Sequence, residues 1–280
     1  MQSIAAWIKR HPLTAFFVLA YTFSWLPWVL GSLVPASRPF VLYPFESGGP
    51  LLAALVVIPI TQGRAGLRAL GASMLRWRVG WGWYALALGL PLVVALGAAV
   101  LNALLGAPVP ALAQLGPWYM PFLAFAVRLI NPSDGPLGEE PGWRGVALPG
   151  LQAKRSPLAA TLILALLVTG WHLPLALASG IDQLPPIALL ATIAVTFWYA
   201  WVYNRTGGSA LMTLVAHAAE GVFFQFAMAG FAGANTMRLV WLYTALWCAV
   251  AVGVVIFDRS AWRSRMPAAP ANVEAVPSIS

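Results

Sequence analysis

The chain has 280 residues, of which 60% are hydrophobic and only 9% are charged. A soluble domain carries about 25% charged residues, so this composition excludes an ordinary soluble protein and indicates an integral membrane protein. The formal charge of +8 does not indicate a nucleic-acid-binding protein, because the basic residues lie between apolar runs rather than on one soluble face.

Eight apolar runs approach the length of a membrane-spanning helix, which needs about 20 residues. In chain order they cover residues 13–34, 48–63, 81–106, 117–131, 157–177, 185–203, 208–230 and 237–257. Each is predicted to be a helix, because backbone groups cannot stay unpaired in lipid and the runs lack the alternation of barrel strands. The predicted fold class is therefore all-α: a polytopic bundle of about eight transmembrane helices. It forms one domain over residues 1–265, followed by a disordered tail over 266–280.

The basic residues predict the orientation, since cytoplasmic loops carry an excess of Lys and Arg. With the N-terminus inside, the inner segments hold Lys9, Arg10, Arg64, Arg68, Arg76, Arg78, Arg144, Lys154, Arg155, Arg205, Arg259, Arg263 and Arg265. Only Arg38 and Arg238 fall outside, and Arg128 falls within a span. Both termini are therefore predicted to be cytoplasmic.

Five ionisable residues stand out from those in solvated loops: Glu139, Glu140, Glu220, His172 and His217. An ionisable side chain at membrane depth costs a few kcal/mol and usually faces the bundle interior for a functional reason. For either histidine alone, a hydrogen-bonded interior residue is the alternative. The combination of two imidazoles with a pair of carboxylates favours a functional site.

The paired carboxylates lie in residues 138–145, GEEPGWRG, one residue after the helix-breaking stretch NPSDGP. A helix is predicted to begin at Glu139 and Glu140, because Pro141 suits a first-turn position. Glu140 and Arg144 are four residues apart and are predicted to pair on one face, whereas Glu139 lies about 100° round the helix and is free to point elsewhere. A surface helix with an ordinary ion pair is the alternative.

Glu139, His172 and His217 together predict hydrolysis of an amide, by either of two routes. A carboxylate and an imidazole can hold a water and take its proton, while the second imidazole donates to the oxyanion. Alternatively, the three side chains could ligate a catalytic zinc with an open fourth position. The chain has no His-Glu-x-x-His or Gly-x-Ser-x-Gly motif, and its single cysteine, Cys248, excludes a thiolate cluster. No cofactor is favoured, and zinc stays open.

Three segments resemble the motifs of the CPBP family: GEEPGWRG at 138–145, GWHLP at 170–174 and RTGGSALMTLVAHAAEG at 205–221. This family comprises the CAAX-protease and bacteriocin-processing (Abi) intramembrane proteases and is related to the type II CAAX prenyl endopeptidase. The resemblance covers a motif core of about residues 135–225, with the motifs in the family order.

The resemblance implies an intramembrane endopeptidase that cleaves a peptide bond near the cytoplasmic membrane face. Glu139 would activate the water, His172 would be its partner, and His217 would stabilise the oxyanion; in a zinc enzyme the same three would bind the metal. Four further residues would hold supporting positions: Glu140, Arg144, Trp171 and Glu220. The implied setting is a prokaryotic plasma membrane, with a peptide or membrane-associated protein as substrate and no nucleic acid. The oligomeric state is not predicted.

The chain departs from the family motifs at two positions. The second motif usually has Phe four residues before its histidine, where this chain has Val168, and this replacement changes packing. The third motif usually has Asn four residues after its histidine, where this chain has Gly221. Losing an oxyanion donor has cost about 10²–10³ in rate in other enzymes. Asn235, Gln225 and a protonated Glu220 are the candidates to replace it.

Two other functions stay open. The absence of the Asn suggests a catalytically weakened family member that acts as a binding or bacteriocin-immunity protein. An unrelated transporter could use the acids and histidines as a proton relay, although the chain has no inverted repeat to support that function.

Overall fold

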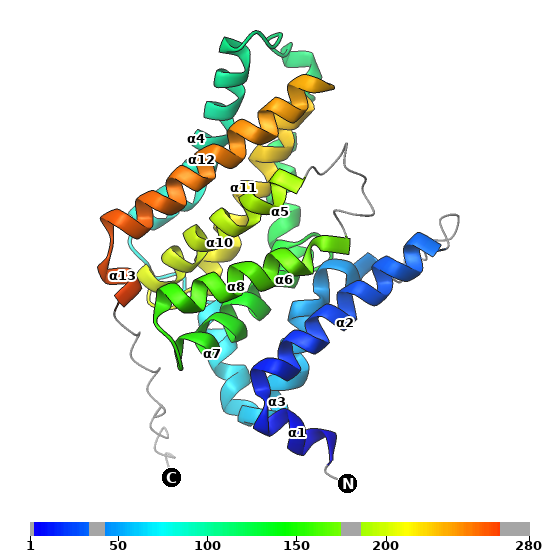
Figure 1. Cartoon of the computed structure of the whole chain (residues 1–280), viewed down its shortest axis with the longest axis vertical. Helices are drawn as coiled ribbons and strands as arrows, with labels where there is room; N and C mark the ends of the chain where they lie inside the picture. Colours follow the sequence, from blue (N-terminus) through cyan, green and yellow to red (C-terminus); the bar gives the residue numbers. More distant parts are fainter. Residues whose placement is uncertain (1–2, 34–42, 175–185, 264–280) are drawn as a thin grey trace, which may run out of the picture.

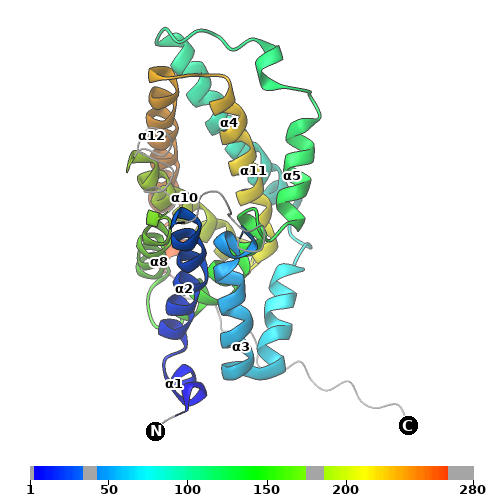
Figure 2. The same ribbon diagram turned by 90° about the vertical axis from the view of Figure 1, so that its right-hand side faces the viewer.

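The computed structural model describes residues 3–33, 43–174 and 186–263, which form helices joined by turns and loops, with no strand among them (Figures 1 and 2). The long helices are α2 (Pro12–Leu33), α3 (Tyr43–Met74), α4 (Trp81–Leu104), α10 (Pro186–Arg205), α11 (Ala210–Ala229) and α12 (Ala234–Phe257). The shorter ones are α1 (Ile4–Arg10), η2 (Leu112–Leu115), α5 (Met120–Ile130), α6 (Pro136–Gly142), η3 (Trp143–Ala147), α7 (Leu148–Gln152), α8 (Pro157–Trp171) and α13 (Ser260–Arg263). The all-α class is confirmed; the predicted tail, 266–280, lies outside the described residues.

All eight apolar runs contain a helix, but only six helices in the described part of the chain are long and apolar enough to cross a membrane. α5 has 11 residues and α8 has 15. At 1.5 Å per residue they extend about 17 and 22 Å, against a hydrocarbon core of about 30 Å. The chain is a multi-pass membrane protein, whereas the prediction of eight complete spans is not confirmed.

The second predicted span, 48–63, is the first part of a longer helix. α3 breaks at Gly63, whose φ of 61° and ψ of −150° lie outside the helical region and suit glycine. The helix then continues to Met74 through residues that were predicted to form a cytoplasmic loop. Figure 2 shows the two parts of α3 meeting at the lower end of the molecule.

Two clusters of buried apolar side chains form the interior, and α10 contributes to both. One cluster joins α2, α3, α8 and the segment that begins at Trp143. The other joins α4, α10, α11 and α12 around Trp198 and Trp247. The pocket described below lies where the clusters meet, since Val168 of the first and Tyr199 of the second both line it.

The end of α10 is tied to the end of α12 through Asp258. Its Oδ2 accepts hydrogen bonds from Arg205 Nε at 2.6 Å and from Trp201 Nε1 at 2.8 Å. The hydrogen bond from Arg205 holds the pKa of Asp258 well below its ordinary value. The carboxylate therefore stays charged at neutral pH and fixes two helices that line the pocket.

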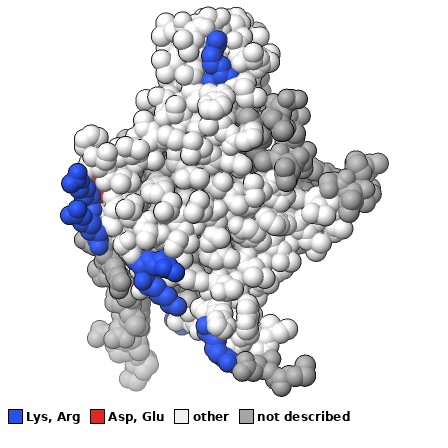
Figure 3. All heavy atoms as spheres, viewed as in Figure 1, with Lys and Arg blue, Asp and Glu red and all other residues white. Residues whose placement is uncertain are grey.

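Exposed basic side chains gather on the lower left of the molecule in Figure 3, with one group near the top. α1 and α13 both lie in the lower half of Figure 1. An even number of spans, six or eight, would leave both ends of the chain on the same side of the membrane. The distribution of basic residues is compatible with the prediction that this side is the cytoplasmic one. Arg144, which was counted among the inner basic residues, is instead buried at 1% exposure.

Candidate functional site

The first motif forms a short helical segment, α6, which begins three residues earlier than predicted. Pro136 holds the first-turn position after Gly135, and Pro141 lies inside the helix. The predicted start at Glu139 was wrong because either proline suits a first-turn position, and Pro136, rather than Pro141, occupies it. An internal proline removes a backbone donor and crowds the preceding turn, and the backbone widens into the π-helix η3 directly after it.

The outer glycines of GEEPG allow α6 to approach the backbone of α3. A Cβ on Gly138 would lie 2.7 Å from the carbonyl oxygen of Ser47, and a Cβ on Gly142 would lie 2.5 Å from that of Pro50. No side chain fits at either position, so both glycines serve close helix packing, as small residues do in membranes. This packing fixes the two glutamates that lie between them.

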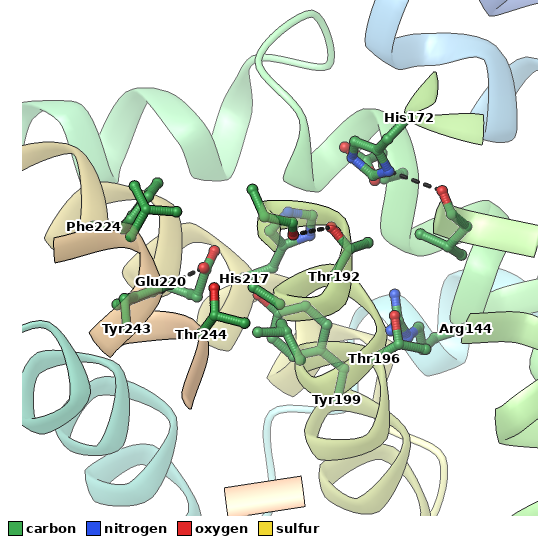
Figure 4. Close-up of a pocket in the computed structure, with 16 residues that line it drawn as sticks. Arg144, His172, Thr192, Thr196, Tyr199, His217, Glu220, Phe224, Tyr243 and Thr244 are labelled. Carbon is green, nitrogen blue, oxygen red and sulfur yellow. Dashed lines mark hydrogen bonds between the residues drawn. The ribbon is translucent and has the colours of Figure 1, made fainter. Parts of the chain in front are cut away.

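A pocket with a volume of ≈160 Å³ opens between α6, η3, α8, α10, α11 and α12 (Figure 4). Its lining comprises Glu139, Arg144, Val168, His172, Ala188, Ala191, Thr192, Val195, Thr196, Tyr199, His217, Glu220, Phe224, Val240, Tyr243 and Thr244. All three predicted catalytic residues line it, as do two of the supporting residues, Arg144 and Glu220. The other two, Glu140 and Trp171, are buried and do not line it.

Glu139 is 5% exposed and faces the pocket. Its Oε2 accepts a hydrogen bond from Trp143 Nε1 at 3.2 Å. The Trp143 ring is itself held between Phe17, which stacks on it, and the edges of Phe16 and Trp171. The carboxylate is thus oriented through a tightly packed indole rather than left free, as the sequence had suggested.

Glu140 is fully buried and binds two other predicted site residues. Its Oε1 accepts from Arg144 Nη1 at 2.9 Å, which is the predicted i,i+4 ion pair, and from His217 Nδ1 at 2.9 Å. The guanidinium of Arg144 lies 4.9 Å from the centre of the Tyr199 ring, and that ring stacks on His217. The carboxylate holds Nδ1–H of His217, so Nε2 accepts in the neutral ring and donates in the imidazolium.

His172 caps α8 at its C-terminal end, and its tautomer follows from one contact. Nδ1 lies 2.8 Å from the carbonyl oxygen of Val168. A carbonyl only accepts, so Nδ1 carries the hydrogen and Nε2 has a free lone pair. Trp171 packs edge-on against the imidazole at 4.8 Å between ring centres and so supports its orientation.

A second polar group lies at the other side of the pocket from His172 and Arg144 (Figure 4). Glu220 Oε1 accepts from the hydroxyl of Tyr243 at 2.5 Å. Thr244 and Tyr199 also line the pocket, and their hydroxyls have no hydrogen-bond partner among the described residues.

The space beside Gly221 is filled by the side chain of Arg128 from α5. A Cβ on Gly221 would lie 2.8 Å from Arg128 Cζ and closer still to Nη1. Arg128 also pairs with Asp134 at 3.4 Å.

Neither Asn235 nor Gln225 lines the pocket, since Asn235 binds Arg238 and Gln225 is exposed. These two candidates for the missing donor are therefore excluded as pocket residues.

Gly221→Asn alone is expected to lower the free energy of unfolding by about 1–3 kcal/mol, because the new side chain must displace the Arg128 guanidinium. In an Arg128→Ala background the same substitution should cost clearly less. A double-mutant cycle on the free energy of unfolding measures the coupling. Additive effects would mean that the two residues do not compete for the same space.

The zinc alternative does not fit the residues as placed. Across residues 3–33, 43–174 and 186–263, no group of three or more His, Cys, Asp or Glu is arranged to hold a metal ion. Glu139, His172 and His217 all line the pocket but do not form such a group.

Several site residues had not been predicted: Arg128, Tyr199, Tyr243 and Thr244. Tyrosines and threonines within apolar runs give no distinguishing signal. Arg128 did give one, as a lone charge within a predicted span, but the sequence pattern does not say which helix it faces.

Comparison with known proteins supports the family resemblance of the motifs. A family model described as type II CAAX prenyl endopeptidase Rce1-like matches residues 117–223. This range includes all three predicted catalytic residues, Glu139, His172 and His217. No curated protein matches the chain.

Proposed function

Since residues 117–223 match the type II CAAX prenyl endopeptidase family, we propose that this chain is an intramembrane endopeptidase in which Glu139, His172 and His217 hydrolyse a peptide bond. One observation carries the proposal. These three proton-handling groups, far apart in the sequence, line a single pocket. A carboxylate and two imidazoles around one cavity are suited to water-mediated acyl transfer.

Glu139 is the general base that removes a proton from a water molecule, whose oxygen attacks the peptide carbonyl carbon. Only Oε2 of this carboxylate is engaged by Trp143, so Oε1 is available to the water. The lone pair on Nε2 of His172 accepts the second hydrogen of the water and orients it, because Nδ1–H is committed to the Val168 carbonyl.

His217 stabilises the oxyanion of the tetrahedral intermediate as an imidazolium. Nδ1–H donates to Glu140, and Nε2–H donates to the oxyanion. Glu140 is held in turn by Arg144. When the intermediate collapses, the carbon–nitrogen bond breaks and the proton held by Glu139 passes to the leaving nitrogen, which yields an amine and a carboxylic acid.

The substrate is expected to be a peptide or a membrane-associated protein, cleaved near the cytoplasmic face of a prokaryotic plasma membrane. The gathering of basic residues at one end of the molecule supports this orientation.

The test is hydrolysis of a panel of quenched fluorescent, membrane-associated peptides by the purified protein in proteoliposomes. Wild type should cleave at least one peptide, at one bond identified by mass spectrometry. His172→Ala should lower the rate by about 10²–10⁴. His11→Ala is the matched control, because His11 is an exposed histidine at the end of α1, and it should stay within about twofold of wild type.

A second candidate function, a catalytically weakened relative that binds peptides or confers immunity to a bacteriocin, is favoured by Gly221 in place of the family's Asn. Wild-type protein that binds peptides from the panel yet cleaves none would support this function and contradict the endopeptidase.

A further inference from the structure

Glu220 is a carboxylate in a membrane-spanning helix, and it forms no ion pair with a lysine or arginine among the described residues. It lies on α11 and lines the pocket. The ion pairs among the described residues involve Glu140, Asp134 and Asp258, and none involves Glu220. A charged group within such a helix is costly unless something compensates its charge. The hydroxyl of Tyr243, at 2.5 Å from Oε1, orients the carboxylate but brings no positive charge.

Two buried hydroxyls beside Glu220 are also unpartnered. Tyr199 and Thr244 are 3% and 2% exposed, both line the pocket, and neither hydroxyl has a hydrogen-bond partner among the described residues. Buried polar groups are normally hydrogen-bonded. Figure 4 shows Glu220, Tyr243 and Thr244 gathered on one side of the pocket. Each of these oxygens can accept a hydrogen from an ammonium or guanidinium group.

The charged residues in and around the pocket also favour a positively charged ligand. Two carboxylates, Glu139 and Glu220, line it, and the one arginine that lines it, Arg144, already forms an ion pair with Glu140. Counted with Glu140, which binds both Arg144 and His217, the site sets three carboxylates against one guanidinium and one imidazole, so it carries an excess of negative charge even with His217 protonated. In a cavity of low dielectric constant, such an excess favours a positively charged ligand.

We propose that Glu220 recognises a positively charged group of the substrate, either a lysine or arginine side chain or a free peptide α-amino group. Tyr243 orients the carboxylate, and Tyr199 and Thr244 accept further hydrogens of the cation. The position of the cation along the peptide rests on the proposed function. His217 and Glu220 are three residues apart on α11, with Cβ atoms about 5–6 Å apart, so the cation lies within a few residues of the cleaved bond.

A different role for Glu220 makes a different prediction. If the side chain were protonated and donated to the oxyanion in place of the missing Asn, it would serve every substrate equally. Glu220→Gln has the size and donor of the protonated acid but lacks the negative charge. It therefore separates recognition of a cation from donation to the oxyanion.

The experiment compares matched peptides that carry lysine, norleucine or glutamate on either side of the cleaved bond, each with a free or an acetylated N-terminus. Wild type should cleave the lysine peptide with a kcat/KM about tenfold or more above that of the norleucine peptide, since close charge pairs couple strongly. In Glu220→Gln this ratio should fall to near one. Asp134→Asn makes the same change from carboxylate to amide outside the pocket lining and should keep the ratio.

Each outcome decides between sources or overturns the proposal. A preference that follows the free N-terminus rather than lysine identifies the α-amino group as the cation. Equal kcat/KM values for lysine and norleucine peptides, with no effect of acetylation, would refute the proposal. A Glu220→Gln variant that keeps the kcat/KM of wild type on every peptide would refute the proposal and fit donation to the oxyanion, since the amide retains the donor. A uniform loss across all peptides would also refute it and assign Glu220 to folding, which a lowered thermal unfolding temperature of that variant would show.

Binding distinguishes failure of this proposal from failure of the proposed function. In the Glu139→Gln variant, fluorescence anisotropy of labelled peptides should show the lysine peptide bound about tenfold more tightly than the norleucine peptide. Addition of Glu220→Gln should abolish that difference. A retained preference in a protein that cleaves nothing would refute the endopeptidase alone, whereas equal affinities in a protein that cleaves would refute cation recognition alone.

Discussion

Replacement of Glu139 by glutamine is expected to lower peptide hydrolysis by about 10²–10⁴ while leaving the fold intact. The amide has the size of the carboxylate, and its oxygen can still accept the hydrogen bond from Trp143. It cannot take a proton from water at neutral pH. The measurement is kcat/KM for the best peptide of the panel, together with the thermal unfolding temperature of the variant.

Asp134→Asn is the matched control for this substitution. Asp134 lies five residues earlier in the chain, is partly exposed and pairs with Arg128 outside the pocket lining. The same change from carboxylate to amide should there alter kcat/KM by no more than about twofold. A Glu139→Gln enzyme that retains activity within tenfold of wild type would show that another group activates the water.

The positions of the helices could be predicted because long apolar runs are a strong signal in a membrane protein. Their lengths could not be predicted as well. α5 is capped at Asn131 and α8 at His172, before either reaches the length of a span, and α3 continues beyond its apolar run because Gly63 lets the chain turn. Hydropathy reports how apolar a segment is, whereas the end of a helix depends on single residues such as Gly63 or Asn131.

The sequence predicted which residues would form the candidate site, but not how their side chains contact one another. The motifs identified Glu139, His172 and His217, and the spacing predicted the ion pair between Glu140 and Arg144. The sequence did not predict that His217 would pair with Glu140, because that contact depends on how α6 packs against α11. The tautomer of His172 was likewise fixed only by a backbone carbonyl.

Contacts between residues of different helices could not be predicted from the sequence. In the sequence, Gly221 indicates only that the amide of the family's Asn is missing. In the structure, the side chain of Arg128, from a helix distant in the chain, occupies the space beside Gly221. Tyr199 and Thr244 lie among apolar residues in the sequence, and only the packing of the helices places their hydroxyls in one pocket with Glu220. Spacing within a helix can be read from sequence, whereas contacts between helices require the packing.

Arg144→Met is expected to lower the free energy of unfolding by about 3–5 kcal/mol, because it leaves the buried charge of Glu140 without its guanidinium partner. Glu140 is 0% exposed, so water cannot replace the lost guanidinium. Unfolding by titration with SDS in mixed micelles measures the effect. Arg155→Met is the control, since Arg155 is exposed and close in the chain; its effect should stay within about 0.5 kcal/mol.

Adding Glu140→Gln to Arg144→Met should recover most of the lost stability, because the buried charge is removed together with its partner. The glutamine oxygen can still accept from Nδ1 of His217, so the ring keeps its orientation. It no longer stabilises a positive charge on that ring, and hydrolysis should therefore stay low. Recovery of both stability and activity would mean that His217 acts as a neutral imidazole. Recovery of neither would mean that the ion pair contributes packing that methionine and glutamine cannot supply.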